Sequence, residues 1–315
     1  MTRIAVVGAG GYVGGRLVAH LRGRGTPTVA IARHSPPWLG DPLASVDLLA
    51  DPPGALDAAV DGCDVLVHVA GHDEVRFAAE PEASLHETIS MTQRVADAAT
   101  RLGAGRVVYL STVHVYGAQL RPGAVITEGV VPEPRAAYAL ARLTSEHLLA
   151  GALAGGPGLV VLRLTNSVGA PVHPAVDRWT LLVNDLVLQL LRTGEVGLRT
   201  PGLQWRDFVD LGDVCQAIAA AAGTGVPPGT YNLGSGQAAT VREVADLVAA
   251  RGEALLGVPA TVVAPSADGP GDEPYHVDVG RLAALGVRAD TPTVRSIDEV
   301  LQFCADHRGD LAEAR

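Results

Sequence analysis

The sequence predicts an α/β fold in which helices cover both faces of a parallel sheet. Short apolar runs rich in β-branched residues alternate with longer segments whose apolar residues recur at helical spacing. Strands that alternate with helices in this way form parallel sheets. A chain of 315 residues can bury a large core and still form a second lobe. We therefore expect a doubly wound parallel sheet with a smaller C-terminal lobe.

Composition restricts the classes of partner and the chemistry that the chain can use. A formal net charge of −10 argues against nucleic-acid and anionic-membrane partners, and no apolar run approaches a membrane span in length. The cysteines Cys63, Cys215 and Cys304 lie far apart, without metal or redox spacing. We expect no metal site, and reduced thiols in a cytoplasmic protein without a signal peptide. All 24 basic residues are arginine, since the chain contains no lysine.

A glycine-rich loop near the N-terminus joins the first strand to the first helix. The apolar run Ile4–Val7 predicts a buried strand, and the loop after it carries glycine with GxxGxxG spacing. Glycine allows positive φ and a close backbone approach to a pyrophosphate, which the N-terminus of the helix would hold. A glycine turn without a ligand is the simpler alternative. We predict a dinucleotide site that includes Gly8, Gly11, Tyr12, Val13 and Gly14.

The end of the second strand, Thr28–Ala32, indicates which cofactor is used. In nucleotide-binding folds an acid here bonds the 2′-hydroxyl of NAD, whereas an arginine accommodates the 2′-phosphate of NADP. This chain has Arg33 and His34 at this point and no acid. A solvated loop arginine is the alternative. We predict NADP, with NAD as the other possibility.

Further strands and helices complete the expected sheet. Strands are predicted at 45–48, 65–69, 106–110 and 159–164, and helices at 56–60, 84–100 and 136–150. Asp47, in the first of these strands, would contact the adenine amino group or simply end the strand. Ala70 and Gly71 are small enough to let a cofactor lie close. Thr112 would lie at the carboxyl end of a central strand, where doubly wound sheets bind ligands.

The pattern loosens after Pro171, which suggests a separate lobe. Helices are expected at 179–192 and 213–222, a short strand at 231–234, and a further helix after Thr240, which forms a capping box with Glu243. We predict a Rossmann-like dinucleotide-binding domain of residues 1–165 with about 206–235. Residues 166–205 and 236–315 would form a discontinuous substrate lobe.

These landmarks together resemble the extended short-chain dehydrogenase/reductases, specifically the NAD(P)-dependent epimerase/dehydratase group that acts on nucleotide-activated sugars. The resemblance covers nearly the whole chain and depends on the order and spacing of its motifs. The matching segments are the glycine loop 8–14, Asp47-Leu48, 67–71, 111–117, Tyr138 with a cation four residues later, 163–169, 206–209 and 231–236.

The resemblance implies a role for each matching position. Tyr138 would be the general acid/base, Arg142 would stand at the family's lysine, and Thr112 would hydrogen-bond the substrate oxygen. Both Tyr138 and Arg142 would also contact the cofactor. The other implied cofactor contacts are Asp47, Leu48, Val69, Ala70, Gly71, Thr88, Leu164 and Asn166, and the implied substrate contacts are His114, Asn166 and Arg206. Pairing of helices 84–100 and 136–150 would give a homodimer.

Three features depart from the family pattern. Arg142 replaces the lysine with a wider planar fork, so it either substitutes for that lysine or marks an impaired or altered site. Thr88 stands where the family often has asparagine. Val113 and His114 follow Thr112, where sugar 4,6-dehydratases carry an Asp-Glu pair, which argues against water elimination.

We therefore predict an NADP(H)-dependent oxidoreductase that reduces a keto group on a nucleotide-linked deoxysugar. A C4 epimerase with retained NAD is the alternative among enzymes. A catalytically silent nucleotide-binding protein is the alternative of another class, and Arg142 is its only support.

Overall fold

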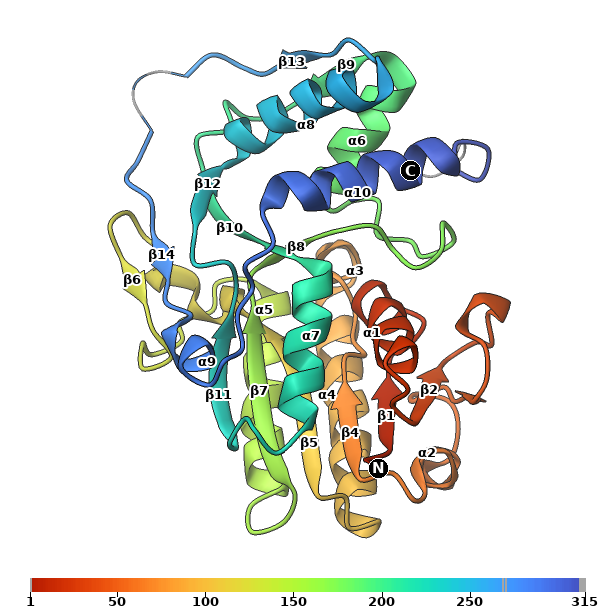
Figure 1. Ribbon diagram of the computed structural model, residues 1–315. Helices are drawn as coiled ribbons and strands as arrows, with labels where there is room; N and C mark the ends of the chain where they lie inside the picture. The colour runs from red at the N-terminus through yellow and green to blue at the C-terminus, as the bar shows by residue number, and fades with distance from the viewer. Residues whose placement is uncertain (1, 268, 270, 312–315) are drawn as a thin grey trace.

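The computed structural model describes residues 2–267, 269 and 271–311. A seven-stranded parallel sheet in the order β11-β7-β5-β4-β1-β2-β3 forms the larger part of the molecule (Figure 1). Its strands are β1 Ile4–Val7, β2 Thr28–Ala32, β3 Leu43–Ser45, β4 Val65–His68, β5 Arg106–Thr112, β7 Gly158–Leu164 and β11 Gly229–Leu233. The strand order reverses between β1 and β4, which confirms the predicted Rossmann-like fold.

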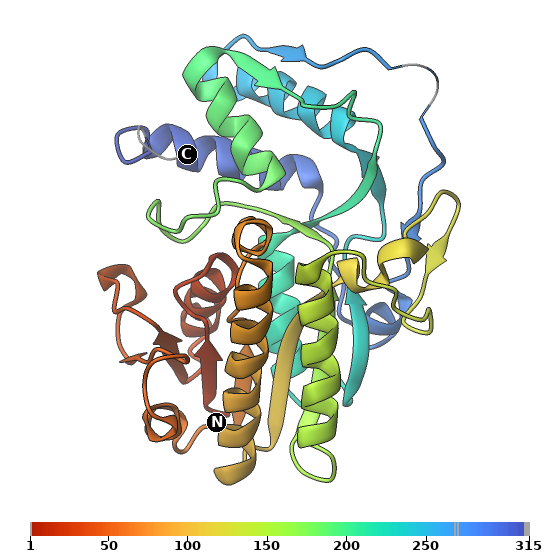
Figure 2. The same ribbon diagram turned by 180° about the vertical axis from the view of Figure 1, so that it is seen from behind.

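Helices cover both faces of this sheet (Figures 1 and 2). One face carries α1 (Tyr12–Gly23) and α7 (Leu211–Ala222), and the other carries α2 (Pro53–Val60), α4 (Pro81–Arg101) and α5 (Ala137–Ala152). Alternate residues of β1 enter the two cores, because successive side chains of a strand point to opposite faces. Val6 packs in the core with Leu17 of α1, whereas Val7 packs in the core with Val95 of α4.

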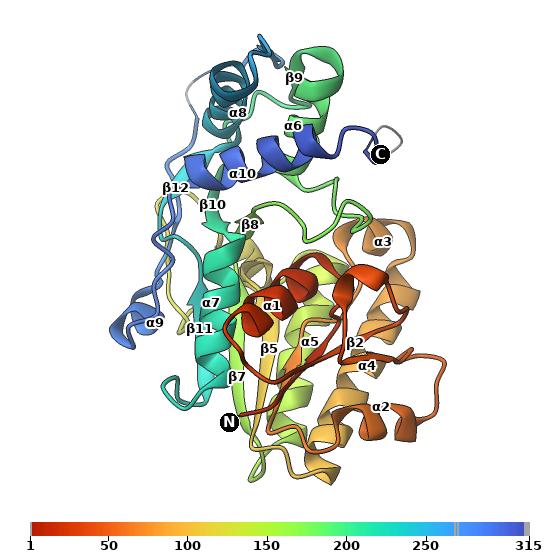
Figure 3. The same cartoon turned by 45° about the vertical axis from the view of Figure 1, so that its right-hand side comes forward.

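A smaller lobe lies beyond the carboxyl ends of the strands (Figures 1 and 3). Its helices α6 (Leu182–Thr193), α8 (Val241–Leu256) and α10 (Thr293–Asp306) share a core that includes Leu186, Val248 and Ile297. The pair β9 (Glu195–Gly197) and β13 (Thr261–Val263) lies at its outer edge. The capping box of Thr240 and Glu243 begins α8 as the sequence predicts. A second sheet, β12 (Ala238–Thr240), β10 (Trp205–Asp210) and β8 (Asn166–Val168), lies between the lobe and the main sheet.

The remaining elements border the sheet. They are the 3-10 segments η1 Pro37–Leu39 and η2 Val113–Gln119, the helices α3 Glu74–Ala79 and α9 Gly280–Ala284, and the paired strands β6 Val125–Ile126 and β14 His276–Val277. The segment with β14 and α9 returns to the main sheet, where Leu282 joins the core on the α1 and α7 face. No helix in the described part of the chain is long and apolar enough to cross a membrane.

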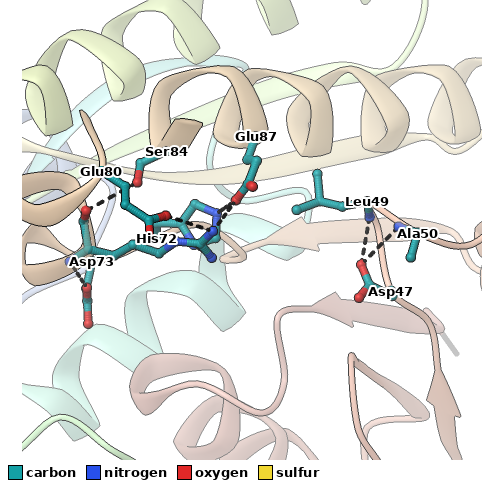
Figure 4. Close-up of polar contacts among 9 residues, drawn as sticks. Asp47, Leu49, Ala50, His72, Asp73, Glu80, Ser84 and Glu87 are labelled. Carbon is teal, nitrogen blue, oxygen red and sulfur yellow. Dashed lines mark hydrogen bonds and ion pairs between the residues drawn. The ribbon is translucent and has the colours of Figure 1, made fainter. Parts of the chain in front are cut away.

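Two local expectations about secondary structure were wrong. The third strand ends at Ser45, before Asp47 and Leu48, because the Asp47 carboxylate accepts hydrogen bonds from the amides of Leu49 (2.8 Å) and Ala50 (3.2 Å) and turns the chain (Figure 4). Helix α6 begins at Leu182 and not at residue 179, since the chain around Trp179 is a turn in which the indole donates to the Pro174 carbonyl.

Candidate active site

A cleft of about 790 Å³ lies at the carboxyl ends of the sheet strands, bordered by the smaller lobe. It brings together most of the residues that the sequence singled out. Those lining it are Gly11, Tyr12, Val13, Gly14, Arg33, Val69, Gly71, Thr112, His114, Tyr138, Arg142, Leu164, Asn166 and Arg206. The lining does not include Gly8, His34, Asp47, Leu48, Ala70 or Thr88.

The glycine loop has a shape that only glycine can supply. Gly8 has φ of 100°, and a Cβ there would lie 2.6 Å from the amide nitrogen of Ala70. A Cβ on Gly14 would lie 2.1 Å from the Gly8 carbonyl oxygen. Helix α1 follows at once, with no side-chain cap on Gly11 and no acid in its first turn. Its free N–H groups therefore form an anion site of the kind that holds a dinucleotide pyrophosphate.

Arg142 lies against the backbone that follows β4. Gly71 has φ of 155°, and a Cβ built on it would lie 2.8 Å from Arg142 Nη2. Arg142 is 8% exposed, and its Cζ lies 5.3 Å from the ring centroid of Tyr138. Burial by itself would lower the pKa of Arg142, but the phenols of Tyr138 and Tyr109 beside it raise that pKa above its usual value. The site thus holds a permanent cation next to the predicted acid/base.

Tyr138 and Thr112 both line the cleft. Tyr138 is half-buried on α5, and its ring meets Phe77 of α3 edge-on, with centroids 5.6 Å apart. Thr112, 5% exposed, ends β5, and its Oγ1 accepts a hydrogen bond from the His114 amide at 3.2 Å. Because that bond uses only a lone pair, the Thr112 proton can still be donated to an oxygen in the cleft.

A buried ion pair fixes the elements that carry these groups. Glu146 of α5 and Arg163 of β7 are each 7% exposed, and their Oε2 and Nη2 atoms lie 2.7 Å apart. Ser111 of β5 also donates a hydrogen bond to Glu146. This network ties β5, α5 and β7 together, and Arg163 Nη1 is its one buried nitrogen without a hydrogen-bond partner among the described residues.

The substrate side of the cleft carries His114, Asn166 and Arg206. Burial between the cleft walls and the nearby charge of Arg206 lower the pKa of His114, although its side chain remains accessible from the cleft. Asn166 Nδ2 donates to the Asp207 carbonyl at 2.9 Å, which fixes β8 against β10. Arg206 Nη1 donates to the Trp205 carbonyl, so most of its donors stay available.

The opposite end of the cleft is open. Arg33 and His34 are both exposed, and Arg33 makes no ion pair among those found in the described residues. The amide of Leu49 chiefly lowers the pKa of Asp47, whose Oδ1 it bonds. Thr88 is 1% exposed within α4 and does not reach the cleft, because it faces the packed interior beside Thr92.

Sequence reasoning missed several charged residues in the lining. His72 follows Gly71, and its Nε2 lies 2.6 Å from Glu87 Oε2, which also pairs with Arg76 at 2.9 Å (Figure 4). The run of charged residues at 72–76, directly after the Val-Ala-Gly motif, was the available sequence signal for this cluster. Arg178 pairs with Asp73 at 2.9 Å and with Glu74 at 3.1 Å. No sequence signal could have found that pairing, because its partners lie more than a hundred residues away.

Arg178 belongs to a segment that crosses α1 and α3 on its way from β8 to α6 (Figure 3). The Tyr12 hydroxyl donates to the Gly169 carbonyl at 2.6 Å, and Arg16 Nη1 donates to the Ala170 carbonyl at 2.7 Å. Trp38 and His173 stack with ring centroids 5.7 Å apart. These contacts join the segment to the glycine-loop helix and so close one side of the cleft.

The described residues contain no group of three or more histidine, cysteine, aspartate or glutamate side chains that could hold a metal ion. The residues around the glycine loop fit a dinucleotide for two reasons. Backbone atoms occupy the positions of a Cβ at Gly8 and Gly14, so the turn has the tight packing typical of dinucleotide-binding loops. No side chain caps the N-terminus of α1, so its N–H groups can bind the pyrophosphate.

Comparisons with known proteins agree with this geometry. The model of the NAD dependent epimerase/dehydratase family matches residues 4–234. The chain is 31% identical over 289 residues to a dTDP-6-deoxy-L-talose 4-dehydrogenase (NAD(P)(+)) of Kitasatospora kifunensis, covering 88% of this chain and 87% of that one. It is 28% identical to a dTDP-glucose 4,6-dehydratase of Streptomyces antibioticus, covering 97% and 93%. Among solved structures, MoeE5 in complex with UDP-glucose and NAD superimposes with a TM-score of 0.82 at 25% identity, covering 97% and 99%.

Proposed function

The chain belongs to the NAD dependent epimerase/dehydratase family, and we propose that it reduces a keto group on a nucleotide-linked deoxysugar with NADPH. One observation carries the proposal: Thr112, Tyr138 and Arg142 line the same cleft, with the Arg142 guanidinium beside the Tyr138 ring, and no carboxylate follows Thr112. The similarity to a dTDP-6-deoxy-L-talose 4-dehydrogenase supports the same substrate class.

Each member of this group has a distinct role. A bound nicotinamide cofactor supplies the hydride. Tyr138 donates a proton to the oxygen of the carbonyl that is reduced, and Thr112 donates a hydrogen bond to the same oxygen as negative charge grows on it. Arg142 keeps a positive charge beside the phenol throughout, which stabilises the phenolate left after proton transfer. The glycine loop and the first turn of α1 hold the cofactor's pyrophosphate.

Water elimination requires a further acid and base that this chain lacks at the expected place. Val113 is 1% exposed and packs into an apolar cluster, and His114 has a lowered pKa that favours the neutral ring. The acids that line the cleft are Asp73 and Glu74, and Arg178 pairs with both. These features favour reduction over dehydration, although a dehydratase is among the similar proteins.

Arg33 is the basis for proposing NADPH. It lines the open end of the cleft beside the glycine loop, it is exposed, and the described residues offer it no ion-pair partner. A guanidinium in this position is free to bind a 2′-phosphate by charge-assisted hydrogen bonds.

The test is to incubate the purified protein with NADPH and a panel of nucleotide-linked 4-keto-6-deoxysugars. Consumption of one NADPH for each sugar reduced supports the proposal. Interconversion of two sugars without net consumption of cofactor would support a C4 epimerase instead. Tight cofactor binding without turnover of any sugar in the panel would support a catalytically silent protein.

We also propose that the molecule is a homodimer through α4 and α5, which lie side by side on one face of the sheet (Figure 2). Leu140 of α5 is 46% exposed, as expected of a helix that meets another subunit. Light scattering at micromolar concentration tests the proposal, and a monomeric mass would contradict it.

A further inference from the structure

A cluster of buried polar side chains lies behind Arg142 and has no part in the proposed reaction. It consists of His68 on β4, Thr88 and Thr92 on α4, Tyr109 on β5 and Ser145 on α5, each at most 1% exposed. Burial of so many polar groups is costly unless they are hydrogen-bonded. Among the described residues, four atoms in and beside the cluster have no hydrogen-bond partner of good geometry: His68 Nδ1, Thr88 Oγ1, Tyr109 Oη and Arg142 Nε. The side chains of Arg142 and Ser145 nevertheless lie close enough to the Tyr109 phenol to oppose the rise in its pKa that burial causes.

Hydrogen-bond accounting fixes the tautomer of His68. Thr92 Oγ1 lies 2.9 Å from the Thr88 carbonyl, 3.1 Å from Ser145 Oγ and 3.1 Å from His68 Nε2. The Thr88 carbonyl can only accept and is the nearest of the three atoms to Thr92 Oγ1, so we assign the Thr92 proton to that carbonyl, and Thr92 then accepts from His68 Nε2. His68 therefore carries its hydrogen on Nε2 and presents a bare acceptor at Nδ1. Burial, followed by the charge of Arg142, lowers the pKa of His68 to about 3, which keeps the ring neutral.

The unmatched groups complement one another. His68 Nδ1 needs a donor, whereas Arg142 Nε–H and the Tyr109 hydroxyl are buried donors that need an acceptor. The His68 and Tyr109 rings lie 5.2 Å apart, and the charge of Arg142 acts on both side chains. A single buried water that accepted from Nε and the phenol and donated to Nδ1 would satisfy all three atoms.

We propose that His68 and Tyr109, joined to Arg142 Nε by one buried water, are positioning residues that hold the guanidinium against the cofactor side of the cleft. The inference rests on the proposed function, because it assigns Arg142 to the cofactor. It also distinguishes arginine from lysine at this position. A lysine has a methylene where arginine has Nε, so it offers no donor to the water at that depth.

A double-mutant cycle on NADPH affinity, measured by cofactor fluorescence, tests the inference without a substrate. In the wild-type background, we expect Tyr109→Phe to weaken NADPH binding by about tenfold, the scale of a lost hydrogen bond that serves a charged group. In the Arg142→Lys background, the same change has less than about a twofold effect, because the contact it would break is already absent. Equal losses in both backgrounds would show that Tyr109 is merely structural, and would overturn the inference.

Tyr116→Phe is the matched control. Tyr116 is equally buried, but its hydroxyl donates to Asn232 Oδ1 at 2.7 Å, on a path that does not involve Arg142. We expect Tyr116→Phe to lower thermal stability and to leave NADPH affinity unchanged. If Tyr109→Phe fails to fold, the NADPH affinity of Arg142→Lys alone tests the proposal. An Arg142→Lys variant that binds NADPH as tightly as the wild-type protein would contradict it. A wild-type protein that binds no nicotinamide cofactor refutes the proposed function, whereas additivity in the cycle refutes only the positioning role.

Discussion

The two ends of the cleft differ in how deeply their side chains are buried. At the buried end, Thr112 and Arg142 are 5% and 8% exposed, and fixed neighbours surround them. At the other end, Arg33 and His34 extend into solvent from the loop after β2. Side chains at the buried end are positioned before any ligand arrives, which favours transition-state stabilisation. Those at the open end are exposed to solvent, so we expect their contribution to be smaller and sensitive to salt.

The largest effect is expected from removing the acid at the buried end. Tyr138→Phe lowers kcat by about a thousandfold, since a positioned proton donor contributes 10² to 10⁴. NADPH affinity changes little, because the hydroxyl supplies a proton and no phosphate contact. Steady-state kinetics and cofactor titration measure the two quantities. Tyr231→Phe is a control, because the Tyr231 hydroxyl donates to the Pro227 carbonyl at 2.9 Å and neither residue lines the cleft. Wild-type turnover by Tyr138→Phe would exclude this tyrosine as the acid.

Thr112 should show the next largest effect. Thr112→Val keeps the shape of the side chain and removes its donor, so kcat falls by about a hundredfold, the typical loss of one such donor. Thr112→Ser retains the hydroxyl and most of the activity. Comparison of kcat for the two variants is the measurement. If the serine and valine variants were equally slow, packing and not hydrogen bonding would explain the role of Thr112.

At the open end, the expected effect is on cofactor choice. Arg33→Asp weakens NADPH binding by about ten- to a hundredfold, because it removes a charge-assisted contact and adds repulsion. NADH affinity stays nearly the same. Titration of both cofactors measures the change. Arg24→Asp, a charge reversal at the exposed far end of α1, is the control. Tighter binding of NADH than NADPH by the wild-type protein would contradict the assignment of Arg33.

The smallest effect concerns stability and pH at the buried end. The folded protein keeps His68 unprotonated down to a pKa of about 3, whereas the unfolded chain binds the proton near the ordinary value of 6.5. The contribution of His68 to the free energy of unfolding is therefore fully present above that ordinary pKa. As pH drops below it, the contribution decreases by about 1.4 kcal/mol per pH unit. Denaturant unfolding at several pH values between about 6 and 4 measures the slope.

His68→Asn should flatten this pH dependence, while His34→Asn, at the exposed end, should leave it unchanged. A wild-type slope that persists in His68→Asn would show that other groups cause the acid sensitivity. That result would also remove the clearest energetic difference between the two ends of the cleft.

The sequence predicted the fold well, because the strands of the main sheet are buried apolar runs and the glycine loop has a fixed geometry. It misplaced the third strand, since at a sheet edge the Asp47 side chain outweighs a weak strand preference. Tyr138, Arg142 and Thr112 were predicted from the spacing of the motifs, and all three line the cleft. The pairing of Arg178 with Asp73 could not be found, because local patterns carry no information about contacts between distant segments. The role proposed for His68 could not be predicted either. The sequence of an apolar strand with one histidine does not show whether both ring nitrogens are hydrogen-bonded.

The contact between Gly71 and Arg142 limits how this site can evolve. The guanidinium occupies the space in which any side chain at position 71 would lie, 2.8 Å from the nearest nitrogen. A side chain at position 71 would require both that Arg142 is shortened and that the backbone leaves its φ of 155°, which strains any residue other than glycine. We therefore expect positions 71 and 142 to covary, because sterics allow a side chain at position 71 only where the residue at position 142 is short.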